Sequence, residues 1–262
     1  MTVVSSVGLA GLAGCSGGDT PADAAEPTVT ETATATPTAT GTESPAGGTD
    51  GQVDLPPGTS ASGIAEPGQL IQTTQAALRQ NGYDITTTLT SGDPDRTITQ
   101  HFRSSLESKR HSFVFDAPDG TARVFVGNGT IYQQSGGSDT STRPLDQQFD
   151  EYHRSRDIVR MLGGQETLGG ILDAGEFQPS GTGEHRGRPV VEFALAGVTL
   201  GSDDTEITSS SGSLVIGADG VVFEARLRVE YATAEDDRVY ENTFVIDELG
   251  TVSVSEPSWV QE

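Results

Sequence analysis

The sequence predicts an α+β fold in which a strongly curved antiparallel sheet, a half-barrel of about ten strands, packs on an N-terminal helix and a short helical insertion. Three observations lead to this prediction. Apolar residues have helical spacing at residues 67–80, and most later segments alternate apolar and polar residues with a period of two. This alternation is interrupted midway, at residues 145–175, where helical spacing returns. We expect residues 53–262 to form one such domain.

The first helix is predicted over residues 67–80. Its apolar and small residues share one face, and they are Leu70, Ile71, Thr74, Ala77 and Leu78. Asn81-Gly82 provides a stop signal. The alternation from Tyr83 to Leu89 then predicts the first strand. In the helical insertion, one helix is expected just before Gly163-Gly164 and a second, containing Leu168 and Ile171, just before Gly175.

The remaining strands are predicted from the same alternation. The expected segments are residues 97–104, 110–116, 121–126, 130–134, 188–195, 213–216, 221–231, 238–247 and 251–254. The clearest is Val221–Tyr231, where Leu227 and its alternate neighbours point one way and Arg226 and its neighbours the other. Such a strand belongs to an antiparallel sheet covered on one side only. Gly217–Gly220 is expected to form the tight hairpin that leads into it.

The charge balance suggests a high-salt environment. Acidic residues outnumber basic ones 38 to 15, the formal net charge is −23, and Lys109 is the only lysine. This composition is typical of extreme halophiles, whose molar salt screens repulsion to within about 3 Å. The same charge repels polyanions, so we expect no nucleic-acid partner. An intrinsically disordered acidic protein is the alternative, and the regular apolar pattern after residue 53 argues against it.

The N-terminus carries an export and anchoring signal. Val3–Gly14 is a short apolar run, too short to span a membrane, and Leu12-Ala13-Gly14-Cys15 resembles the lipobox of lipoprotein signal peptides. This resemblance implies cleavage before Cys15 and attachment of lipid to its thiol, which would hold the protein at the extracytoplasmic face of the cell membrane. A structural cysteine after a chance apolar run is the alternative. No Lys or Arg precedes Arg79, so we expect the natural signal to begin upstream of Met1.

A solvated tether is predicted to follow the anchor. Residues 16–52 consist mainly of Thr, Ala, Pro, Gly and Glu, a composition that predicts disorder. The threonines are candidate O-glycosylation sites. Asn128-Gly129-Thr130 is an N-glycosylation sequon in an expected turn. Asn-Gly also serves such a turn without a glycan.

The order of these features resembles a family of lipoproteins of halophilic archaea. The residues that carry the resemblance are the Leu12–Cys15 lipobox, the Thr-rich spacer, Leu55–Gly58 with Gly63-Ile64, the helix running into Tyr83, and the Gly217–Gly220 hairpin. The layout is also similar to the LolA and LppX class of lipoprotein carriers, in which a helix-plugged half-barrel holds acyl chains. This likeness is an analogy of fold and carries over no ligand residue.

The sequence contains none of the usual catalytic, metal-binding or nucleotide-binding motifs, and we predict neither enzymatic activity nor a cofactor. His101 and His111 lie in neighbouring predicted strands and could approach each other, while surface or core roles are expected for them and for His153 and His185. Solvated roles are preferred for the acidic residues that could in principle hold a cation or act in catalysis. These are Asp93, Asp95, Asp203, Asp204, Glu206, Glu151, Asp157 and Glu166.

Two functions remain open at this stage. The first is a tethered binding protein whose concave face receives a lipid or another apolar ligand. The side chains expected to line it, chosen for size and inward phase, are Phe113, Phe115, Phe223, Leu227, Tyr240 and Phe244. These six side chains could equally form a dry core. The second function is a non-catalytic structural or interaction module of the cell envelope, with no small ligand and an unknown protein partner.

Replacing Cys15 by alanine is predicted to release the protein from the membrane, because the thiol that accepts the lipid is lost. When expressing cells are fractionated, the variant should be found in the soluble extracellular fraction instead of the membrane pellet. The mass of its mature chain should not include the mass of a lipid. Replacing Ala13 by serine, another small residue, should leave the anchor in place. A Cys15→Ala chain that stays in the membrane fraction contradicts the assignment.

Overall fold

The structure is a computed structural model. The chain divides into two units, Met1–Thr49 and Asp50–Glu262. The residues that the structure describes all belong to the second unit, and they are 54–92, 96–137, 139–155, 167–199, 206–232 and 237–261. The predictions for Cys15, for the tether and for the helix before Gly163-Gly164 concern residues outside these ranges.

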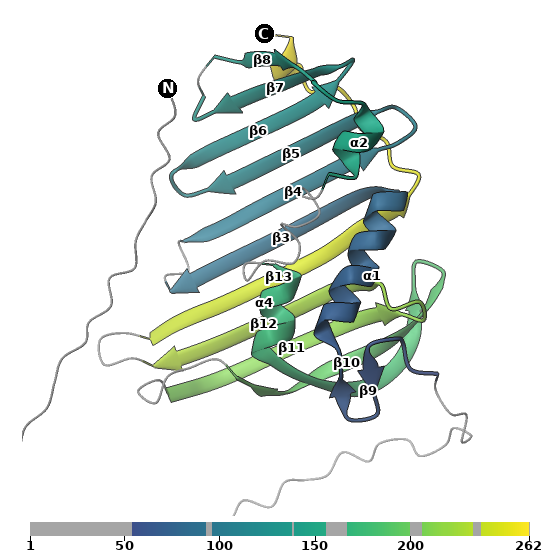
Figure 1. Ribbon diagram of the computed structural model, residues 1–262. Coiled ribbons are helices and arrows are strands. Elements are labelled where there is room, and N and C mark those ends of the chain that lie inside the picture. Colours follow the sequence, from purple (N-terminus) through teal and green to yellow (C-terminus); the bar gives the residue numbers. More distant parts are fainter. Residues whose placement is uncertain are drawn as a thin grey trace, which may run out of the picture. The chain divides into compact units, whose positions relative to one another are not determined.

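An antiparallel sheet of eleven strands organises the second unit (Figure 1), in the order β8-β7-β6-β5-β4-β3-β13-β12-β11-β10-β9. The strands are β3 (Gly82–Gly92), β4 (Thr97–Ser105), β5 (Arg110–Ala117), β6 (Gly120–Gly127), β7 (Thr130–Ser135), β8 (Ser141–Pro144), β9 (Gly175–His185), β10 (Arg188–Val198), β11 (Glu206–Gly217), β12 (Val222–Ala232) and β13 (Asp237–Gly250). The sheet stays open, because its edge strands β8 and β9 do not pair with each other. A separate two-stranded sheet joins β1 (Thr59–Ser60) to β2 (Gly63–Ile64).

The described helices lie on one face of the large sheet (Figure 1). They are α1 (Pro67–Gln80), α2 (Phe149–His153) and α4 (Leu168–Ala174), and a 3-10 turn, η1 (Ser258–Val260), lies near the C-terminus. We call this face of the sheet the helix face and the opposite one the outer face. The predicted fold, an open α+β half-barrel, is therefore confirmed. No helix in the described ranges combines the length and the apolar character needed to cross a membrane.

The main core lies between α1, α4 and the helix face of β3 and β9–β13. α1 begins and ends at the predicted residues, and the side chains it buries are Leu70, Thr74 and Leu78. The sheet and α4 also contribute side chains to this core. The largest of these that are fully buried are Phe193, Phe244, Ile85, Leu168, Ile171, Leu214, Ile216, Leu227 and Ile246. Burying each of them contributes on the order of 2 kcal/mol, which makes this half of the domain the stable part of the fold.

The strand Val222–Ala232 follows the predicted alternation. Leu227 and Val229 are 1% exposed on the helix face, whereas Arg226 and Arg228 are exposed on the outer face. The predicted hairpin before it is also confirmed, because the amide of Gly220 donates to the carbonyl of Gly217 over 2.8 Å.

Several elements differ from the prediction, among them the short strands β1 and β2, which were not predicted. β9, β8 and α2 were also not predicted, because β9 is rich in Gly and carries Pro179, and the other two have only 4 and 5 residues. The strand predicted over residues 251–254 is wrong. The carbonyls of Ser253 and Val254 are instead bonded by the side chains of Arg103 and Arg110, at 2.9 and 3.3 Å. This segment also buries Val252 and Val254 with Trp259 against Phe125 in a separate small core.

Candidate functional site

Burial of the helix face decreases along β4–β6 with distance from α2. Next to α2, Ser104 and its cross-strand partner His111 are buried. Two residues further along β5, Phe113 is only half-buried, although it stacks on Phe102 with ring centroids 4.7 Å apart. A further two residues on, Phe115 is also half-buried. In Figure 1 the described helices lie over the other half of the sheet and over one end of β4–β6.

Five half-buried side chains form what we call the apolar strip. They are Leu89 from β3, Ile98 from β4, Phe113 and Phe115 from β5, and Val124 from β6. The register places them on one face, because Leu89 lies opposite Ile98 on neighbouring strands, and Phe113 lies opposite both Phe102 and Val124. An apolar surface that remains partly hydrated beside a dry core is a typical feature of a ligand-binding face.

The six side chains predicted to line a ligand fall into two groups. Phe223, Leu227 and Phe244 are 4%, 1% and 0% exposed within the main core, whereas Phe113, Phe115 and Tyr240 are half-buried. The strip therefore unites two of the predicted residues with three that the sequence did not single out. Alternation had placed Leu89 on the correct face, but the phase of a strand carries no information about which of its residues a helix will cover.

Three buried side-chain oxygens on this face have no hydrogen-bond partner, namely the hydroxyl of Tyr83 and the amide oxygens of Asn242 and Gln100. Asn242, on β13 directly opposite Leu89, is fully buried, and its amide nitrogen donates to the carbonyl of Thr167 over 3.3 Å. Its Oδ1 accepts no hydrogen bond. Gln100 lies opposite Phe115, and its Oε1 is likewise buried and unpartnered. Leaving a buried acceptor unpaired costs about 1–3 kcal/mol, so the two amide oxygens call for a donor.

A buried polar cluster fastens α2 to the sheet and to α1. The Oγ of Ser104 lies 2.7 Å from Nδ1 of His153, whose Nε2 lies 3.1 Å from the carbonyl oxygen of Leu78. Because a carbonyl can only accept, Nε2 carries the proton and donates it, and Nδ1 accepts from the serine hydroxyl. His153 also stacks on Tyr83, with ring centroids 5.4 Å apart.

Burial shifts the titration of this cluster. Burial lowers the pKa of His111 to about 4, with a smaller contribution from the neighbouring His153, whose own pKa burial also lowers. Burial raises the pKa of Tyr83 and of Tyr152. Both histidines are therefore neutral at pH 7. A serine on a neutral histidine is the arrangement of a nucleophile and its base, but the contacts of Ser104 and His153 here are those that fasten α2 to the sheet and to α1.

The remaining histidines lie apart from this cluster. The suggested approach of His101 to His111 is wrong, because His101 lies opposite Val114 on the outer face whereas His111 lies on the helix face. His101 Nε2 is instead 2.5 Å from Asp84, which also pairs with Arg103. His185 stacks on Phe223, with ring centroids 5.3 Å apart.

The remaining sequence candidates do not assemble into a site. Glu151 and Glu206 are exposed, and the other acidic candidates lie outside the described residues. Across the described part of the chain, no three His, Cys, Asp or Glu side chains gather where they could hold a metal ion. Asn128 is exposed, and with φ of 52° followed by 72° at Gly129 it occupies a tight hairpin turn. Its glycosylation remains a prediction.

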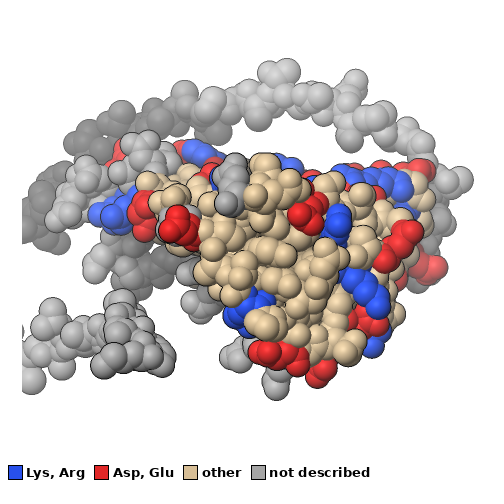
Figure 2. Space-filling view, turned by 90° about the horizontal axis from the view of Figure 1, so that it is seen from above, with Lys and Arg blue, Asp and Glu red and all other residues tan. Residues whose placement is uncertain are grey.

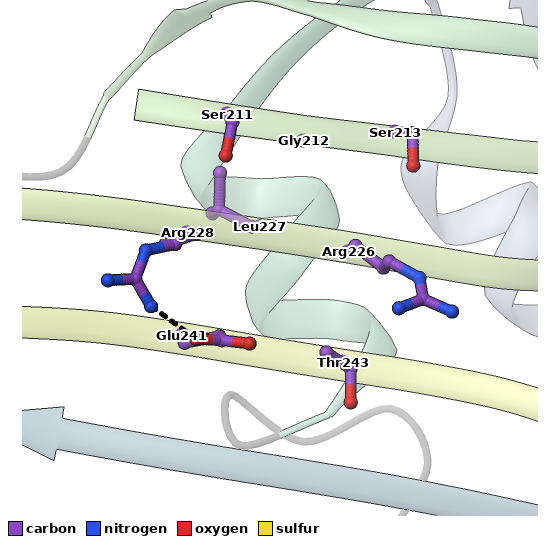
Figure 3. Close-up of a pocket in the computed structure, with 8 residues that line it drawn as sticks. All are labelled: Ser211, Gly212, Ser213, Arg226, Leu227, Arg228, Glu241 and Thr243. Carbon is purple, nitrogen blue, oxygen red and sulfur yellow. Dashed lines mark hydrogen bonds and ion pairs between the residues drawn. The ribbon is translucent and has the colours of Figure 1, made fainter. Parts of the chain in front are cut away.

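A hollow of about 370 Å³ lies on the outer face over β11–β13 (Figure 3). Arg226 and Arg228 flank it, and its other lining residues are Ser211, Gly212, Ser213, Leu227, Glu241 and Thr243. Each arginine is already paired, Arg226 with Glu224 at 2.6 Å and Arg228 with Glu241 at 2.7 Å. The charges that line the hollow are therefore neutralised by neighbouring side chains, which leaves no unpaired arginine there to bind an anion.

On the face seen from above, charged side chains are not gathered in one patch. Figure 2, which looks at the domain from above, shows basic and acidic side chains interspersed around a continuous uncharged surface. Interspersed charges keep a surface solvated without steering a polyion of one sign to it.

No protein-family model and no curated protein matches the chain. Solved structures with a similar arrangement include LprF from Mycobacterium bovis, 12% identical over 75% of this chain and 98% of that chain, with a TM-score of 0.33. The MucA/MucB complex of Pseudomonas aeruginosa is 15% identical, with a TM-score of 0.32, and this chain covers 60% of that one. A DUF1329 family protein from Desulfovibrio piger is 10% identical, with a TM-score of 0.18. Similarities this distant identify no ligand and no partner for this chain.

The buried His111 predicts a loss of stability in mild acid. Its pKa is lower in the folded protein, at about 4, than the ordinary 6.5 expected after unfolding. The unfolded chain therefore takes up the proton first, and stability that is fully present above pH 6.5 is lost as the pH falls towards 4. Between pH 7.5 and 5 this loss is about 2 kcal/mol.

Replacing His111 by phenylalanine should remove this contribution. Denaturant unfolding at pH 7.5 and 5, in the same salt, should show a smaller pH-dependent drop for the His111→Phe variant than for the wild type, whatever its stability at pH 7.5. Equal drops for the two proteins contradict a buried neutral histidine at this position.

Proposed function

We propose that this protein is a membrane-anchored extracytoplasmic binding protein, without catalytic activity, whose apolar strip receives a lipid chain or another apolar ligand. The single observation that carries the proposal is the half-burial of five apolar side chains on the same sheet face that elsewhere forms a dry core. A protein that only needed to be stable gains nothing by leaving this surface in contact with water, because burying it is favourable at about 25 cal/mol per Å².

The size of the strip is sufficient for useful affinity. Removing the exposed part of one such side chain from water contributes on the order of 1 kcal/mol to binding, and the strip contains five of them. Together with the ligand's own buried surface, this offsets the several kcal/mol that association costs and leaves room for micromolar binding. Affinity of that order suits a protein that must both take up and release its ligand.

The fold holds the strip between two rigid neighbours. On one side lies the main core under α1 and α4, where Leu227 and Phe244 are buried. On the other side α2 is fixed through His153 to Ser104 and to the backbone of Leu78. A pre-formed surface of this kind binds with a smaller loss of conformational entropy than a mobile one.

The location follows from the sequence features at the N-terminus. A lipid on Cys15 and the solvated residues 16–52 would hold the domain near, but not in, the membrane. That placement gives the strip access to membrane lipids, and stable anchoring requires two lipid chains rather than one. The alternative, an interaction module of the cell envelope, needs no half-buried apolar strip on the helix face.

Replacing Phe115 by serine should weaken the binding of an apolar fluorescent probe, N-phenyl-1-naphthylamine, by about tenfold. The matched control is Val114→Ser, which changes the neighbouring half-buried residue on the same strand, on the outer face. Titration in molar salt should show wild-type affinity for the Val114→Ser protein. Equal affinity of both variants and the wild type, or no probe binding at all, contradicts a ligand site on the strip and favours the interaction module.

A further inference from the structure

We infer that the ligand of the apolar strip is a neutral long-chain alcohol, whose hydroxyl donates a hydrogen bond to one of two unpartnered side-chain oxygens, that of Gln100 or that of Asn242. This inference rests on the proposed function and names the class of ligand. It comes from the two unpartnered amide oxygens and from the absence of charged side chains on the helix face of β3–β7.

Gln100 places its acceptor inside the strip itself. The residue lies on β4 between Thr87 and Phe115 on its two neighbouring strands, and Ile98 and Phe102 flank it along its own strand on the same face. Its Oε1 is buried without a donor. An apolar residue would fit these neighbours at no such cost, whereas an amide with three rotatable side-chain bonds can turn its oxygen towards a ligand hydroxyl.

Asn242 provides the second acceptor at the border of the strip. It is fully buried, with Leu89 opposite it on β3 and Leu227 opposite it on β12. Its amide nitrogen is occupied by the carbonyl of Thr167 and by the hydroxyl of Tyr240, at 3.3 and 3.2 Å. The nitrogen therefore fixes the orientation of the amide, and the oxygen is the atom left for a donor.

The arginines that share the helix face lie outside β3–β7: Arg238 on β13 stands opposite Tyr231, and Arg143 on β8 stands opposite Ile131. On β3–β7, the described positions that share the face of the strip carry no Lys or Arg and no Asp or Glu. The one titratable base there, His111, is buried with a lowered pKa and is neutral at pH 7. A carboxylate or phosphate head group would lose its hydration without gaining a partner, whereas a hydroxyl both tolerates this surface and satisfies an acceptor.

The spacing of the two oxygens sets the scale of the ligand. Asn242 and Gln100 lie on strands either side of β3, in register with Leu89 and Thr87 respectively. Two strand spacings and one two-residue repeat separate their backbones by about 12 Å. A chain of about ten or more carbons that starts at either oxygen therefore crosses the strip.

The test compares three probes of equal chain length. In molar salt, 1-dodecanol, dodecyl methyl ether and dodecanoate would each displace N-phenyl-1-naphthylamine from the full-length protein. We expect the alcohol to compete about fivefold to tenfold better than the ether, and better still than dodecanoate. In the double variant Gln100→Leu/Asn242→Leu, shown to be folded by circular dichroism, the preference for the alcohol should fall towards unity, and the single variant that loses most of it identifies the acceptor. Gln134→Leu, a matched amide replacement on β7 with its side chain on the outer face, should keep it.

Each outcome decides the matter. Equal competition by alcohol and ether in the wild type, or a preference for dodecanoate, overturns the inference while leaving an apolar site in place. Such a result assigns the two orphaned oxygens to buried water. Failure of both N-phenyl-1-naphthylamine and dodecanol to bind overturns the proposed function and this inference with it. The wild-type comparison stands even where a leucine variant does not fold.

Discussion

A sheet of eleven strands has a face wider than the described helices can cover. At a strand spacing of about 4.8 Å the sheet measures roughly 50 Å across, whereas a helix with its side chains is about 10 Å in diameter. α1 and α4 bury the half formed by β9–β13 and β3, and α2, with 5 residues, covers only one end of β4–β6. The apolar strip is what remains, and the proposed function follows from this mismatch in area.

The buried polar cluster determines where that uncovered surface ends. Because His153 accepts from Ser104 and donates to the backbone of Leu78, α2 is fixed to both the sheet and α1. Satisfied polar contacts of this kind specify a position more strictly than apolar packing does. The unsatisfied oxygens of Gln100 and Asn242 occur on the same face beyond the reach of α2. On the helix face, Ser104 and His153 are thus paired with each other beneath α2, whereas the amide oxygens of Gln100 and Asn242 lack a donor.

The sequence predicted most helices and strands correctly, but it did not predict how deeply their residues are buried or which distant segments they contact. Pro67 and Asn81-Gly82 bounded α1 correctly, and strict alternation identified β12, because both signals are local. β9 was missed because an edge strand tolerates Gly and Pro, which remove the alternation. The cluster of Tyr83, Ser104, His111 and His153 joins four separate segments, so no spacing in the sequence could reveal it. For the same reason the sequence placed Phe115 and Phe244 on one face without distinguishing a half-buried residue from a core one.

The most direct test is to look for a bound lipid. The Cys15→Ala chain, produced in a halophilic host, would be purified in molar salt without detergent, incubated with vesicles of that host's lipids, separated from them, and examined by native mass spectrometry and by lipid extraction. The account predicts one neutral, hydroxyl-bearing lipid per chain. Protein that carries no lipid, either as purified or after incubation, would contradict a ligand-binding helix face and favour a solid interaction module of the cell envelope.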